Sequence, residues 1–184
     1  MGCGVGVGVV LLAWALLGRS MRGALRRAFR PVSVRWRRGL SLAGYAGRGA
    51  LHGRTLSVRG AWAWRDRSTS SLEIELASGA GFSARFVPRS QAPAPPQALD
   101  VPGCPDYLIF SDAADKTLAL ARAAQGELHR VLAARAAAER RVVEVRSGVV
   151  ALTVTGLVWP ELTAASLARD LDELVALATK AERV

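Results

Sequence analysis

The sequence predicts an α+β fold: an N-terminal apolar helix and a basic neck, then an antiparallel sheet with two helices packed on one face. Three observations support this prediction. Residues 2–17 carry no charge, residues 19–39 are rich in arginine, and strand and amphipathic-helix patterns fill residues 40–184. With 184 residues, the chain is long enough for one domain with a substantial core.

The net charge of +10 is concentrated in the first third of the chain. Up to Arg65 there are 12 arginines and no acidic residue, whereas the remaining residues carry a net charge of −2. A basic segment beside a nearly neutral domain predicts contact with an anionic surface, either a membrane or a nucleic acid. The two cysteines, Cys3 and Cys104, form no paired motif and indicate neither a disulfide framework nor a metal site.

The uncharged segment at 1–18 predicts a membrane-embedded helix. Its 16 residues from Gly2 to Leu17 would span roughly 24 Å of a hydrocarbon core about 30 Å thick. The residues expected in the membrane are Val9, Val10, Leu11, Leu12, Trp14, Leu16 and Leu17. A cleavable signal peptide fits less well, because no basic residue precedes the apolar run. A helix of the protein's own core is the alternative.

Residues 19–30 predict an amphipathic helix that lies on an anionic membrane surface. Met21, Leu25 and Phe29 recur every fourth residue on its apolar face, and Pro31 ends the pattern. The arginines expected to contact the membrane surface are Arg19, Arg22, Arg26, Arg27 and Arg30. Because these basic residues follow the apolar segment, we expect a single-pass protein with its N-terminus outside and its domain in the cytoplasm. A solvated basic linker is the alternative.

The domain at 40–184 begins with strand patterns. Apolar and polar residues alternate at 52–59, 71–77 and 82–87, and a short apolar strand is expected at 107–110. Six of the eight prolines lie at 88–105, which predicts an extended loop.

Two helices and a hairpin are predicted in the second half of the domain. Ser111 or Asp112 is expected to cap a long alanine-rich helix that reaches about residue 138. Strands at 142–145 and 149–155 are joined by a turn at Ser147 and Gly148. The last helix has an apolar stripe made of Leu167, Leu171, Leu174, Val175 and Ala178.

Three stretches together resemble a pattern in uncharacterised bacterial proteins with an N-terminal membrane anchor and a small α+β domain. They are residues 49–60 (GALHGRTLSVRG), the strand–Asp–helix run near 107–115, and the closing hairpin and helix. The resemblance covers most of the chain after residue 40. It implies this architecture and no particular activity.

No catalytic, metal or cofactor signature stands out in the sequence. Neither His52 nor His129 is placed beside a nucleophile. The acidic residues Asp170 and Glu173 lie off the apolar stripe of the last helix, and we expect them to be solvated. We therefore expect no catalytic residue, no cofactor, no metal and no small-molecule substrate.

The sequence thus predicts a non-enzymatic membrane-anchored protein with the anionic lipid leaflet as its contact. Its cytoplasmic domain would bind a protein partner or support an envelope assembly. The first alternative is a soluble arginine-rich protein that binds nucleic acid. It is disfavoured because only Trp36 stands among the arginines and no nucleic-acid motif occurs. The second alternative is an enzyme whose site forms only in the fold.

Overall fold

A computed structural model gives the structure of the chain. It describes residues 23–37 with gaps at 24, 28 and 31, and then residues 44–61, 70–91, 98–99, 106–157 and 163–184. The predicted membrane segment at 1–18, together with Arg19 and Arg22, lies outside the described residues.

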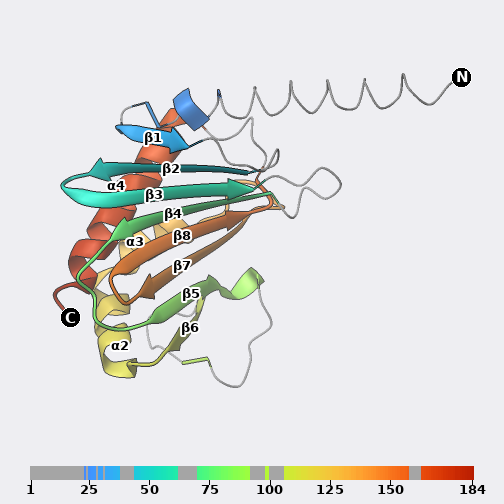
Figure 1. Cartoon of the computed structure of the whole chain (residues 1–184). Helices are drawn as coiled ribbons and strands as arrows, with labels where there is room; N and C mark the ends of the chain where they lie inside the picture. Colours follow the sequence, from blue (N-terminus) through green and yellow to red (C-terminus); the bar gives the residue numbers. More distant parts are fainter. Residues whose placement is uncertain are drawn as a thin grey trace, which may run out of the picture.

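One antiparallel sheet of eight strands forms the centre of the described part (Figure 1), in the order β1-β2-β3-β4-β8-β7-β5-β6. The strands are β1 (Val34–Arg37), β2 (Gly44–Leu51), β3 (Arg54–Ala61), β4 (Ser71–Ala77), β5 (Ala84–Pro88), β6 (Tyr107–Ser111), β7 (Arg140–Arg146) and β8 (Val149–Thr155).

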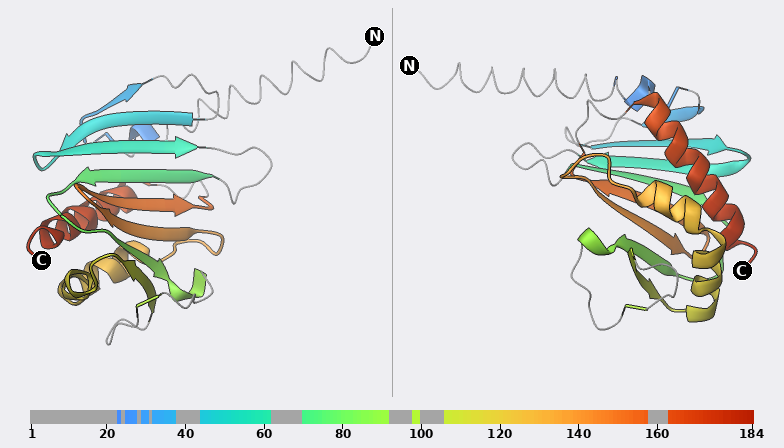
Figure 2. Two further views of the ribbon diagram at one scale, coloured as in Figure 1. Left: turned by 60° about the horizontal axis from the view of Figure 1, so that its bottom comes forward. Right: turned by 180° about the vertical axis from the view of Figure 1, so that it is seen from behind.

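The helices lie against one face of this sheet, as the view from behind in Figure 2 shows. They are α2 (Ala114–Ala123), α3 (Gln125–Leu132) and α4 (Ala164–Ala181), and a short 3₁₀ turn, Arg89–Gln91, follows β5. The predicted α+β class, with an antiparallel sheet and helices on one face, is confirmed. We call the face under the helices the inner face and the opposite face the outer face.

Two strands were not predicted, β1 and β2. Glycine ordinarily weakens a strand, but here Gly47 of β2 and Gly60 of β3 make room for neighbouring side chains. A Cβ added to Gly47 would lie 2.5 Å from Cγ1 of Val34, and one added to Gly60 would lie 2.1 Å from the ring of Tyr45. Aromatic side chains therefore cover bare backbone on the inner face of β1–β3, an arrangement known to compensate for glycine in strands.

The order of the strands departs from the chain order where the β7–β8 hairpin lies between β4 and β5. The link from β4 to β5 is held by the turn of that hairpin. The N–H of Ser78 donates to the carbonyl of Gly148 at 2.9 Å, and the N–H of Gly148 donates to the carbonyl of Ala80 at 3.0 Å. The predicted hairpin turn is confirmed, with Gly148 at a φ of 84° that favours glycine.

The predicted long helix is divided into α2 and α3 at Ala124, and it ends near residue 132 rather than 138. The residue before α2 is Ala113, which provides no side-chain cap. Neither predicted capping side chain serves as the N-cap because both tie the end of β6 to its surroundings. The carboxylate of Asp112 accepts from the N–H of Ser83 at 2.9 Å, and the hydroxyl of Ser111 accepts from the N–H of Ala113 at 2.9 Å.

The hydrophobic core lies between the helices and the inner face of the sheet. The stripe predicted on α4 is confirmed, since Leu167, Leu171, Leu174 and Ala178 are buried and Val175 is half-buried. Facing them across the core are buried residues of the central strands, Leu72, Ile74, Leu76, Val143, Val145, Val150, Leu152 and Val154.

A charged cluster is buried at one end of this core. The Nη1 and Nη2 atoms of Arg141 lie 3.1 and 2.7 Å from the two carboxylate oxygens of Asp170. The Nε of Arg141 donates to Glu139 at 2.8 Å, and Arg135 donates to Asp170 at 2.6 Å. Burial opposes the charge of Arg141, but the hydrogen bond with Asp170 and the two carboxylates keep the pKa of Arg141 raised above its ordinary value.

The expectation that Asp170 is solvated is therefore wrong, because the residue is 2% exposed. Asp170 lies at the edge of the apolar stripe of α4, opposite the start of β7, where the side chain of Arg141 extends into the core. Glu173 is half-buried and pairs with Arg130. The apolar spacing within α4 could not reveal the burial of Asp170, because its cationic partner Arg141 belongs to another element, strand β7.

The C-terminal end of α4 is attached to the start of β3 and to the link after β4. The carboxylate of Glu182 accepts from Nη2 of Arg54 and from the N–H of Gly79, each at 2.8 Å. The hydrogen bonds from Arg54 and Gly79 lower the pKa of Glu182 to about 2.

Acidification is expected to remove the stabilisation that Glu182 provides. Because its pKa falls from 4.5 to about 2 on folding, this stabilisation is fully present above pH 4.5 and is lost as the pH falls through 2. Glu182→Gln should lower the free energy of unfolding at neutral pH by about 1 kcal/mol or less, since solvent screens the pair. Urea titrations over a pH series should show the variant and the parent converging at acid pH. A difference that stays constant with pH would contradict this assignment, and the exposed Asp172→Asn is the control.

Candidate membrane-facing surface

The described part of the basic neck folds onto the sheet. Residues 23 and 25–27 are helical, and Leu25 and Phe29 are each 1% exposed within the core. The ring of Phe29 meets Trp36 of β1 edge-on, with 5.5 Å between the ring centroids. The expectation that the side chains of Leu25 and Phe29 face lipid is therefore wrong. They cover the inner face of β1–β2, where the glycines leave little side chain of their own.

The arginines of this segment point away from the core. Arg26, Arg27 and Arg30 are exposed, and Figures 1 and 2 show the segment, in blue, beside β1 at the edge of the sheet. The predicted amphipathic division is therefore present, but the apolar side faces the protein itself. Contact between these arginines and a membrane stays a prediction.

Two further arginines lie at the same edge. Arg35 on β1 and Arg48 on β2 are direct cross-strand partners, and both are exposed. They lie on the outer face, because their neighbours Val34 and Trp36 pack against the core. Among the described residues, neither arginine has an acidic partner. We call the set Arg26, Arg27, Arg30, Arg35 and Arg48 the arginine edge; its last two members were not predicted as site residues.

The arginine edge lies over two aromatic side chains that belong to the packed interior of the fold. Trp36 and Tyr45, with ring centroids 6.3 Å apart, lie half-buried beneath it and pack against the core. Burial also raises the pKa of the Tyr45 phenol, so this hydroxyl remains neutral at physiological pH. The aromatic side chains at this edge thus support the fold, and the exposed groups are guanidinium ions.

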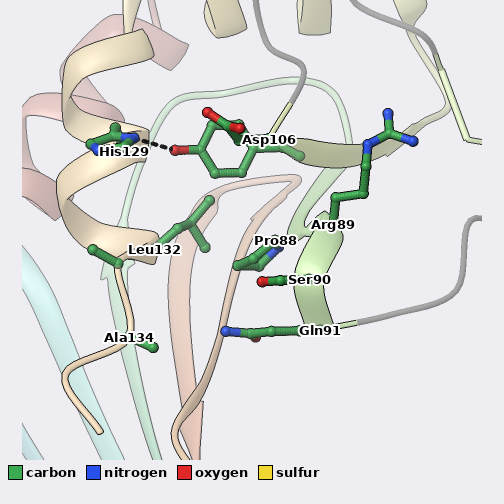
Figure 3. A pocket seen from close by; sticks show the side chains of 10 residues that line it. Pro88, Arg89, Ser90, Gln91, Asp106, His129, Leu132 and Ala134 are labelled. Atoms are coloured by element: carbon green, nitrogen blue, oxygen red, sulfur yellow. Dashed lines mark hydrogen bonds between the residues drawn. The ribbon is translucent and has the colours of Figure 1, made fainter. Parts of the chain in front are cut away.

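A pocket of about 450 Å³ lies near the opposite edge of the sheet, between the end of β5 and the end of α3 (Figure 3). The hydroxyl of Tyr107 and Nδ1 of His129 lie 3.1 Å apart at this site. The Gln91 side-chain oxygen accepts from the N–H of Arg141 at 3.0 Å, and the Gln91 carbonyl accepts from Arg140 at 2.8 Å. Part of its polar lining is therefore engaged in holding the fold together.

Nucleophilic chemistry finds no support in the described part of the chain. The imidazole of His129 is hydrogen-bonded to Tyr107, and no serine or threonine among the described residues is hydrogen-bonded to it; both cysteines lie outside those residues. His52 is exposed in the β2–β3 turn with a φ of 49°. Over the same residues, no cluster of His, Cys, Asp or Glu has a geometry that could hold a metal ion.

Among the described residues, no helix combines the length and the apolar character that crossing a membrane requires. The segment predicted to be embedded, 1–18, lies outside them.

Comparisons with known proteins give one likeness in fold. No protein-family model matches the chain, and no curated protein matches it. Among solved structures, the chain overlaps with the crystal structure of the mycobacterial trehalose monomycolate transport factor A, TtfA. The TM-score is 0.49 at 11% sequence identity, and the overlap covers 83% of this chain and 95% of that chain. An overlap at this level implies no shared activity.

Proposed function

We propose that this chain is a membrane-anchored, non-enzymatic protein whose cytoplasmic domain is held against an anionic leaflet by the arginine edge. In this proposal, residues 1–18 embed in the bilayer, and the domain binds a protein partner or supports an envelope assembly. The observation that carries the proposal is the attachment of the basic segment. Leu25 and Phe29 fix it in the core while Arg26, Arg27 and Arg30 face outward.

This attachment makes the arginines part of a rigid surface. A flexible basic linker would lose conformational freedom on binding lipid, whereas a segment already ordered by the core does not. Each arginine close to an anionic leaflet contributes about 1 kcal/mol. The segment also follows directly after the predicted anchor, so the anchor would hold these charges within reach of the lipid headgroups.

The nucleic-acid alternative is weakened by the position of the aromatic residues. Proteins that bind single strands stack bases on exposed aromatic rings. At the arginine edge, Trp36 and Tyr45 are half-buried and pack against the core. Several described arginines nearer the centre of the sheet are paired with glutamates, as Arg59 is with Glu75 at 2.8 Å.

Fractionation of the full chain tests the anchor. We expect the protein to stay in the membrane pellet after high-salt and carbonate washes. Leu12→Arg with Leu16→Arg should move it to the supernatant, because each charge within the bilayer costs about 2.5–3.5 kcal/mol. Ala137→Arg, in an exposed loop, is the control and should stay in the pellet. Recovery of the unmodified chain in the supernatant would overturn the proposal.

Protease protection tests the sidedness. A protease added to intact cells should leave the domain uncut, and one added to inverted membrane vesicles should digest it. Digestion in intact cells would show that the domain lies outside, contrary to the topology that the basic residues favour.

A further inference from the structure

The outer face of the sheet carries arginines in two different arrangements. Away from the β1 edge, Arg59 on β3 lies 2.8 Å from Glu75, Arg85 on β5 lies 3.4 Å from Glu144, and Arg140 on β7 donates to the carbonyl of Gln91. At the β1 edge, Arg35 and Arg48 stand directly opposite each other, and no acidic partner lies beside either among the described residues. The β1 edge therefore brings together two arginines that lack a carboxylate partner within the described residues.

Like charges directly opposite each other across two strands destabilise a sheet. The register places the Cβ atoms of such a pair about 4.5–5.5 Å apart, so both side chains can reach one anion between them. Each guanidinium presents a planar fork of N–H donors that matches the oxygens of a phosphate group. The next residue in the same row of the sheet is Ser57, paired with Arg48, whose hydroxyl is a further donor.

We propose that Arg35 and Arg48 bind the phosphate group of an anionic membrane lipid, so that the sheet stands with its β1 edge against the bilayer. This inference rests on the proposed function and adds a ligand and an orientation to it. The ligand site differs from the basic segment predicted from sequence, because it lies on the outer face of the sheet.

Arginines on both sides of β1 identify a lipid surface as the occupant. Arg26, Arg27 and Arg30 come from the segment packed on the inner face, whereas Arg35 and Arg48 come from the outer face. A small soluble anion would contact one side of the strand. A lipid leaflet that meets the edge contacts both sides at once, and residues 1–65 contain no acid. The row of Arg35, Arg48 and Ser57 continues to Glu75 on β4, and this carboxylate is paired with Arg59.

Accessibility of a cysteine at this edge tests the orientation. Ala46 is exposed on the outer face of β2, two residues from Arg48. The full chain, with Cys3 and Cys104 changed to serine and Ala46→Cys introduced, is reconstituted in vesicles with its domain outward. Labelling by a bulky, membrane-impermeant maleimide is then compared between phosphatidylcholine vesicles and vesicles that also contain phosphatidylglycerol, in low-salt buffer.

We expect phosphatidylglycerol to slow the labelling of this cysteine. Arg35→Gln with Arg48→Gln should remove most of the protection, because each arginine near an anionic surface changes the association constant of the edge with the membrane about fivefold. Arg85→Gln with Arg122→Gln removes the same charge far from β1 and should leave the protection intact. A reporter cysteine at Ser83, before β5, should be labelled equally in both kinds of vesicle.

The outcomes separate this inference from the proposed function. Equal labelling of the Ala46→Cys chain in both kinds of vesicle, with the chain retained in the membrane, would overturn the lipid site alone. Failure of the chain to remain in either vesicle would overturn the anchor and the lipid site together. Protection in phosphatidylcholine by inorganic phosphate or by a short duplex DNA, equal to that by phosphatidylglycerol, would overturn lipid as the ligand.

The glutamine variants are expected to fold. Arg35 and Arg48 are exposed, and removing two like charges that face each other relieves repulsion. Their midpoints of thermal unfolding should therefore equal or exceed that of the parent chain. A lowered midpoint together with lost protection would show a structural role and would count against the lipid site.

Discussion

Asp170→Ala is expected to lower the free energy of unfolding by about 3–5 kcal/mol, because it breaks a buried ion pair and leaves the guanidinium of Arg141 with the carboxylate of Glu139 alone. Arg141 is 1% exposed, and the carboxylate of Asp170 holds two of its nitrogen atoms. The carbonyl of Val131 and the carboxylate of Glu139 also accept from Arg141. Three segments would therefore lose a common contact: the end of α3, the start of β7 and the first turns of α4.

Urea unfolding of the full chain in detergent, followed by circular dichroism, measures this loss. Asp172→Ala lies two residues away on the exposed side of α4 and should change the free energy of unfolding by less than about 0.5 kcal/mol. Replacing both partners, with Arg141→Met and Asp170→Leu, should recover much of the loss, since apolar residues often substitute well for a buried ion pair. Equal effects of Asp170→Ala and Asp172→Ala would contradict the cluster.

Phe29→Ala is expected to lower the free energy of unfolding by about 3–5 kcal/mol, the usual cost of removing a buried aromatic side chain. It should also detach residues 23–30 from the inner face of β1–β2, because the ring of Phe29 contacts Trp36. The measurement combines urea unfolding with limited trypsin digestion, in which cleavage after Arg26 and Arg27 should become much faster; the Arg30–Pro31 bond resists trypsin.

Arg30→Ala provides the control for this experiment. Arg30 is exposed one residue away, and its loss should leave stability within about 0.5 kcal/mol of the parent. If Phe29→Ala unfolds no more easily than Arg30→Ala, the basic segment is not attached to the core. The rigid surface on which the proposed function depends would then be lost.

The central strands could be predicted from sequence because they alternate cleanly, as Leu72, Ile74 and Leu76 do with Glu73 and Glu75. The same period failed for β2, where glycine stands at the inward positions 47 and 49. The side chains of Val34 and Trp36 on β1 fill the space at Gly47, and the backbone of Ser33 and Val34 lies against Gly49. The sequence pattern of one strand cannot show that its glycines will be covered by residues of a neighbouring strand.

Only part of the candidate surface could be predicted from the sequence, and the reason is related. Amphipathic spacing placed Leu25 and Phe29 on one side and the arginines on the other, but it does not say what covers the apolar side. Here the protein's own sheet covers it. Arg35 and Arg48 were missed as a pair because their proximity depends on the register of β1 with β2, which short sequence patterns do not specify.

The strand order determines how strongly the charge of a membrane at β1 would act on the opposite end of the domain. From β1 to β6 there are eight strands, and successive strands lie about 4.8 Å apart, so the first and last are separated by roughly 34 Å. At physiological ionic strength, electrostatic potential decays over about 8 Å. With β1 at the headgroups, the pocket beside Tyr107 and His129 would lie several decay lengths into the cytoplasm. The affinity for a partner that binds at that end would then not depend on the lipid composition of the membrane at β1.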